Sequence, residues 1–160
     1  QGGELESMLA GLQEQAREYR AIADSVGNDF YAGLALRESE DAEVRRAELM
    51  AANRYLLPNG ENQAQRALEA VVQNHRESRR AAEHALGLAH FHRELAEEEM
   101  RLHPPGQAGF SAERFERHFD AAADLLYRLS QADGQPERLI ARHELDALLE
   151  MGEHVSRLAQ

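Results

Sequence analysis

An apolar stripe at helical spacing runs through the first third of this 160-residue chain. Its members recur every three or four residues, apart from one step of ten between Leu34 and Val44. They are Leu5, Leu9, Leu12, Ala16, Tyr19, Ala23, Val26, Phe30, Leu34, Val44, Ala47, Ala51 and Tyr55. Side chains with this spacing lie on one face of an α-helix. At about 1.5 Å per residue, a continuous stripe of this length describes a rod of roughly 75 Å. The chain is therefore expected to fold as an all-α, elongated helical bundle with a long first helix.

Turn-forming residues divide the chain at three places: Pro58-Asn59-Gly60, residues 103–109, and Asp133-Gly134-Gln135-Pro136. Asn-Gly favours positive φ, Gly ends helices and Pro begins them. Because short connections make neighbouring helices antiparallel, an up-down-up-down arrangement is expected. Four helices are predicted, over residues 4–56, 61–103, 111–132 and 137–159. Residues 1–160 are expected to form one helical-bundle domain, excised from a longer protein.

A weaker break lies at Gly27-Asn28-Asp29, where Gly could end one helix and Asn could cap the next. The apolar phase passes directly from Val26 to Phe30. This continuity favours one long, kinked helix over two separate ones.

The composition excludes several function classes. The chain has 29 acidic residues against 18 basic ones and a formal charge of −11, whereas nucleic-acid binders need a basic face. Every one of the basic residues is Arg, and Cys is absent, which excludes Schiff-base and thiol chemistry. No Gly-rich phosphate loop, nucleophile elbow or His-Glu-x-x-His motif occurs. We therefore expect no enzymatic activity, no catalytic residues and no cofactor.

The middle of the predicted second helix is entirely polar from Gln73 to Arg80. Folding at residues 58–60 places this segment opposite residues 37–46, which are equally polar. One interpretation is an interhelical network of ion pairs, in which each exposed pair stabilises by about 0–1 kcal/mol. That network would join Glu38, Glu40, Asp41 and Glu43 to Arg76, Arg79 and Arg80.

The alternative interpretation is a ligand site formed by His75, Arg76, Arg79 and Arg80. An Arg near a bundle core is costly unless an anion pairs with it. The planar guanidinium group suits a carboxylate or a phosphate. The ligand of this hypothetical site would be an anionic small molecule.

Histidines and aromatic residues are the remaining candidates for a site. His90 and Glu94 are four residues apart, but no Glu-x-x-His or His-x-x-x-His motif occurs. Zinc sites need three or four converging ligands, so no metal site is predicted. The aromatic residues on or beside the stripe of the predicted helix 111–132 are expected in the core rather than in a ligand cage. They are Phe110, Phe115, Phe119 and Tyr127.

The segment from Ala47 to Val71, AELMAANRYLLPNGENQAQRALEAV, resembles extracytoplasmic sensor modules of bacterial histidine kinases and chemoreceptors. In several of those families a long helix ends in an Arg-Tyr-Leu-Leu-like run before a Gly-acidic turn. Residues 54–57 and Gly60-Glu61 are similar to that pattern, and Pro58 departs from it. The resemblance implies a periplasmic input domain, often dimeric, that transmits ligand occupancy through small helix shifts. It identifies no functional residue.

We therefore expect a sensory, ligand-binding module of a transmembrane signalling receptor, placed on the periplasmic or extracytoplasmic face of a bacterial inner membrane. An even number of antiparallel helices puts both ends at one pole, as insertion between two transmembrane helices requires. The module is expected to be a homodimer and to be tethered through segments outside this chain, because no run of about 18 apolar residues occurs in it. The alternative is a cytoplasmic, tetratricopeptide-like adaptor or chaperone that binds a partner protein in an apolar groove.

Overall fold

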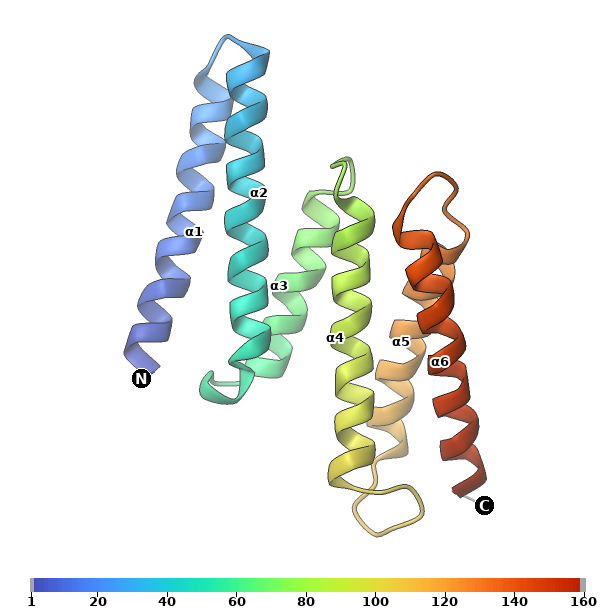
Figure 1. Ribbon diagram of the computed structural model, residues 1–160. Coiled ribbons are helices and arrows are strands. Elements are labelled where there is room, and N and C mark those ends of the chain that lie inside the picture. The colour runs from blue at the N-terminus through green and yellow to red at the C-terminus, as the bar shows by residue number, and fades with distance from the viewer. Residues whose placement is uncertain (1, 159–160) are drawn as a thin grey trace. The chain divides into compact units, whose positions relative to one another are not determined.

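The structure is a computed structural model that describes residues 2–158 (Figure 1). Within this range it contains six α-helices, one 3₁₀ turn and no strand, so the prediction of an all-α helical bundle is confirmed. The elements are α1 (Gly2–Ser25), α2 (Asp29–Ala52), η1 (Arg54–Leu56), α3 (Gly60–Asn74), α4 (Ala81–Leu102), α5 (Ala112–Ser130) and α6 (Glu137–Leu158).

The prediction of one continuous helix over residues 4–56 is wrong. The chain leaves the helix after Ser25 and begins α2 at Asp29, where the side chain of Asn28 caps it by accepting a hydrogen bond from the Phe30 amide at 2.9 Å. The two halves form an antiparallel hairpin (Figure 1). The apolar phase misled the prediction, because Phe30 on the second half is mostly exposed.

The prediction of one helix over residues 61–103 is also wrong. Here α3 ends at Asn74, residues 75–80 form turns, and α4 begins at Ala81. The polar run that begins at Gln73 supplies no apolar side chain to hold a helix against its neighbours, and tertiary packing provides most helical stability. The predicted helices 111–132 and 137–159 are present as α5 and α6; α5 lies within two residues of its expected bounds, α6 begins at the expected residue, and residue 159 lies outside the described range.

Contacts divide the chain into two compact units, residues 1–76 and residues 77–160. Unit 1 contains α1, α2, η1 and α3, and unit 2 contains α4, α5 and α6. The expectation that residues 1–160 form one domain remains a prediction, because one domain can contain two such units.

Unit 1 is packed mainly through small side chains. Its buried hydrophobic residues are Leu5, Leu9, Ala16, Ala23, Ala35, Ala42, Ala47, Met50, Ala64 and Val71. The fully buried Ser39 donates its hydroxyl to the Ala16 carbonyl at 2.8 Å and thereby joins α2 to α1. Alanine-rich faces allow helices to approach closely, and they bury little apolar area per residue.

The turn between η1 and α3 requires glycine. Asn59 has a positive φ of 50°, as the Asn-Gly sequence predicts. A Cβ atom on Gly60 would lie 1.9 Å from the backbone oxygen of Arg54. The absence of a side chain at Gly60 is therefore what allows α3 to start directly against η1.

Unit 2 is packed through larger side chains. Its main cluster contains Leu86, Ala89, Ala122, Leu126, Leu129, Ala141 and Leu148. The α6 helix lies close to the Phe119 ring at Gly152, where a Cβ atom would approach the ring to 2.7 Å. Two buried imidazoles, those of His92 and His118, join α4 to α5 through their Nδ1 atoms at 2.9 Å.

Glu99 fixes the connection between α4 and α5. Its buried carboxylate accepts hydrogen bonds from the Ser111 amide at 2.8 Å and from Arg114 at 2.9 Å, and it lies 3.3 Å from His103 Nδ1. Burial raises the pKa of Glu99, but the Ser111 amide, Arg114 and His103 together outweigh it, and the pKa is lowered. Ser111 caps α5, with its hydroxyl accepting a hydrogen bond from the Arg114 amide.

Candidate functional site

A pocket of about 260 Å³ lies among α1, α2 and α3 of unit 1. Its lining combines cationic side chains with small apolar ones: Gln13, Ala16, Arg17, Arg20, Glu43, Arg46, Ala67, Ala70, Val71 and Asn74. Three short side chains, those of Ala16, Ala67 and Ala70, occupy positions where larger residues would fill the space. The alanine-rich packing of unit 1 thus leaves a hollow beside the arginines.

The acidic residue of the pocket, Glu43, already has a partner. Its Oε2 atom lies 2.8 Å from Nε2 of the buried His75. Asn74 also donates to Oε2, at 3.5 Å, while the Arg20 guanidinium lies 3.9 Å from the other oxygen. Glu43 therefore does not hold any of the three arginines in a close, charge-assisted hydrogen bond, for which N···O distances are about 2.7–2.9 Å.

The arginines of the pocket are weakly engaged. Arg46 is half-buried, its Nε atom is buried without a hydrogen-bond partner, and its guanidinium forms no ion pair with a residue in the described range 2–158. The Arg17 pairing, with Glu14, is 3.8 Å long and solvent-exposed. Such pairs contribute about 0–1 kcal/mol. Three cationic groups thus face one hollow that contains a single carboxylate.

This arrangement can bind an anion. Guanidinium groups form two parallel hydrogen bonds to a carboxylate or phosphate, and a half-buried position reduces competition from water. Pockets for drug-sized ligands span about 300–1,000 Å³, so about 260 Å³ suits a smaller ligand such as an oxyanion or a short organic acid. Nothing in the pocket supplies a nucleophile next to a general base.

Of the four predicted site residues, only His75 lies beside the pocket. His75 contacts Glu43, a pocket residue, so the predicted proximity of residues 73–80 and 37–46 holds at His75, whereas residues 77–80 belong to unit 2. Arg76 is exposed at the end of unit 1 and does not line the pocket. Arg79 is exposed and Arg80 bonds Glu83 through two 3.0 Å contacts, both within unit 2. A ligand contact by these three arginines stays a prediction.

Sequence reasoning missed Arg17, Arg20 and Arg46. Each is adjacent in the sequence to a member of the apolar stripe. The neighbouring stripe residues are Ala16, Tyr19 and Ala47. An Arg next to small residues on the inward face of a helix was the signal from which a cationic pocket could have been predicted. Its meaning depended on the hairpin at residues 26–28, which brings α1 and α2 side by side and which the continuous-helix prediction had removed.

Other types of site are not supported by the described residues. Within residues 2–158 no group of three or more His, Asp or Glu side chains could hold a metal ion, and His90 bonds Glu144 at 2.6 Å. No helix in this range has the length and apolar character that crossing a bilayer requires. No family model, curated protein or solved structure matches the chain.

Proposed function

We propose that this chain is a sensory module that binds a small anion in the pocket of unit 1. The observation that carries the proposal is Arg46, a half-buried cation with no acceptor for its Nε atom, in a chain with 29 acidic residues. A structural role would place one of those carboxylates beside it, since an unpaired buried charge is strongly unfavourable. A ligand that carries its own negative charge explains why the position is left open.

A ligand in this pocket would join different helices. Arg17 and Arg20 belong to α1, and Arg46 belongs to α2. An anion bound by both sets would favour the packing of the hairpin that brings them closest together. Because five of the eight buried hydrophobic residues of α1 and α2 are alanines, we expect small shifts of one helix along the other to require little repacking. Helix displacements of about 1–2 Å are a known way to transmit occupancy.

The membrane context of this proposal comes from the sequence. The resemblance of residues 47–71 to extracytoplasmic sensor modules supports a receptor on the periplasmic face of a bacterial inner membrane, active as a homodimer. The receptor and the adaptor differ in the full-length sequence that each requires. Apolar spans just outside Gln1 and Gln160 are expected for a receptor and not for an adaptor.

Binding is testable on the purified chain. Phosphate, sulfate, nitrate, succinate and citrate are titrated by calorimetry and by thermal shift. We expect at least one of them to raise the melting temperature, since a ligand at 100 times its Kd adds about 2.7 kcal/mol of stability. Replacing Arg46 by Met keeps the aliphatic stem and is expected to weaken binding at least tenfold.

Arg142→Met is the matched control, because Arg142 is exposed on α6 and lies outside the pocket. It should leave the affinity unchanged. The proposal fails if no anion binds, or if the Arg46 and Arg142 variants bind equally well.

A further inference from the structure

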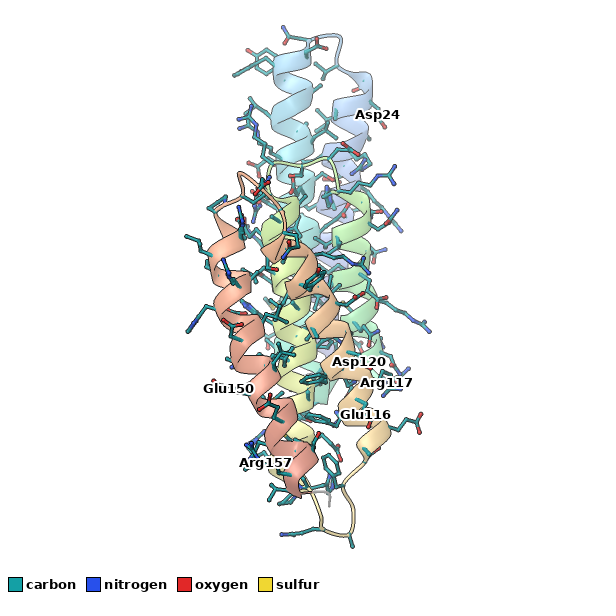
Figure 2. The ribbon with its side chains drawn as sticks, turned by 90° about the vertical axis from the view of Figure 1, so that its right-hand side faces the viewer. Asp24, Glu116, Arg117, Asp120, Glu150 and Arg157 are labelled. Atoms are coloured by element: carbon teal, nitrogen blue, oxygen red, sulfur yellow. The ribbon has the colours of Figure 1, made fainter. Side chains whose placement is uncertain are left out.

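A second hollowed surface lies in unit 2, between α5 and α6. Two adjoining hollows of about 750 and 620 Å³ share Asp120 and Leu149 and together form the α5/α6 groove. Figure 2 looks onto this face, with Glu116 and Asp120 labelled on α5 and Arg157 on α6. From Ala112 to Tyr127 the groove follows α5 for about 22 Å, or four helical turns.

The floor of the groove is apolar and partly open to solvent. Phe110, Phe115 and Phe119 form a row of rings whose successive centroids are 5.9 and 5.6 Å apart. Phe115 is buried, and Phe110 and Phe119 on either side of it are half-buried. Leu149 is 47% exposed. At the other end Tyr127 is 58% exposed, which corrects the expectation that it belongs to the core. Apolar side chains gathered in a groove with a polar rim are typical of a binding surface.

The rim of the groove is acidic. Glu116, Asp120 and Asp124 follow one another at intervals of four along α5, which places them on one line. Glu153 faces them from α6, and Arg157 is the only basic residue among the described residues that line the groove. Asp124 pairs with Arg128, whereas Glu116 and Glu153 form no ion pair within residues 2–158. The rim therefore offers negative charge that the chain itself leaves uncompensated.

We propose that the α5/α6 groove docks an amphipathic helix of a partner protein, with the partner's apolar stripe on the phenylalanine row and its Arg and Lys residues along the acidic rim. Helix-in-groove recognition uses anchors at i, i+3, i+4 and i+7, and four turns of groove accommodate two such sets. The length of the groove exceeds what a small molecule fills. Opposite charges steer such a partner to the groove and reject acidic competitors.

The charge of the chain argues against a second copy as the occupant. At a formal charge of −11, a second molecule would bring further carboxylates to a rim that already lacks cations. The docking surface uses α5 and α6, so it is independent of the anion pocket in unit 1.

The test uses a labelled 18-residue helical peptide with Leu at its a and d positions and Arg or Lys beside them. A second peptide has the same Leu pattern with Glu in place of the basic residues. Fluorescence anisotropy with the intact chain should show binding of the basic peptide, at least tenfold weaker binding of the acidic one, and weaker binding at 500 mM than at 50 mM salt. Equal binding of both peptides, or no binding, overturns the proposal.

Two variants localise the interaction. Leu149→Glu and Asp120→Arg are expected to weaken binding of the basic peptide at least tenfold each. Their matched controls on α6, Leu139→Glu and Glu150→Arg, replace exposed residues outside the groove and should leave it unchanged. Circular dichroism of each variant checks that the helices are retained. Equal losses in variants and controls, or a concentration-dependent dimer that Leu149→Glu abolishes, would contradict the assignment.

Discussion

The two units differ in how they fill their cores. Six of the ten buried hydrophobic residues in unit 1 are alanines, whereas unit 2 buries six leucines and two phenylalanines among thirteen such residues. Burying a Leu or Phe side chain contributes about 1.5–3 kcal/mol, and an alanine contributes far less. Both units bury polar side chains as well, four in unit 1 and six in unit 2 among the described residues, so polar burial does not distinguish them.

This difference predicts that unit 1 deforms more easily than unit 2. Leucine and phenylalanine side chains interdigitate, so one helix cannot move without repacking its neighbours. Alanine faces lack such interlocking, and they leave the hollow beside Arg17, Arg20 and Arg46. The unit proposed to bind the ligand is therefore also the unit whose helices we expect to shift most easily.

The largest expected effect is that of Leu126→Ala in unit 2. Leu126 is fully buried, and removing such a side chain costs about 2–5 kcal/mol because a cavity remains. Leu9→Ala in unit 1 should cost less, because the site is nearer the surface and its small neighbours can move inward. Urea denaturation of both variants measures the difference. Equal losses would show that the two cores are equally rigid.

Gly60→Ala tests the closest backbone approach in unit 1. The added Cβ would overlap the Arg54 carbonyl, so α3 must separate from η1, and overpacking of this kind costs about 1–3 kcal/mol or more. Gly33→Ala is the control, since a Cβ there meets nothing within 4 Å, and it should stabilise α2 by about 0.5–1 kcal/mol. In thermal unfolding, the melting temperature should fall for Gly60→Ala and rise for Gly33→Ala.

Glu99→Gln tests the polar clamp of unit 2. Because the folded-state pKa of Glu99 is lowered, its ionisation stabilises the fold above the unfolded-state pKa of about 4.3, and that contribution is lost as the pH falls through the lower folded value. The Gln variant should be less stable by about 1–3 kcal/mol at pH 7. Denaturation as a function of pH should show a smaller acid-induced loss in the variant. An unchanged dependence of stability on acid pH would show that ionised Glu99 does not stabilise the fold.

The smallest expected effect on stability is that of Arg46→Met. Removing a buried Nε atom that has no acceptor should leave the free energy of unfolding unchanged or raise it by up to about 1 kcal/mol. Chemical denaturation in an anion-free buffer measures this. A loss of more than about 1 kcal/mol would mean that Arg46 is a structural residue, which would weaken the case for a ligand.

Strong local signals made parts of the fold predictable from the sequence. Residues 115–129 and 141–155 keep a helical apolar period between clear breakers, and α5 and α6 are present near their expected bounds. The Asn59-Gly60 turn and the Ser111 cap follow from backbone preferences that act within a few residues.

The missed features depend on tertiary structure. The hairpin at residues 26–28 was missed because Val26 and Phe30 happen to continue the apolar phase, although Phe30 is exposed. The pocket was missed for the same reason, since Arg20 and Arg46 lie 26 positions apart in the sequence and meet only when α1 and α2 fold together. The placement of His75 near Glu43 was predictable, because it depends only on the turn at residues 58–60.

Native-state hydrogen exchange on the intact chain, with and without the anion identified by calorimetry, reports the opening free energy of each helix. We expect weaker protection in α1–α3 than in α4–α6, with a ligand-induced gain confined to α1–α3. Uniform protection across all six helices, or a gain centred on α5 and α6, would contradict it.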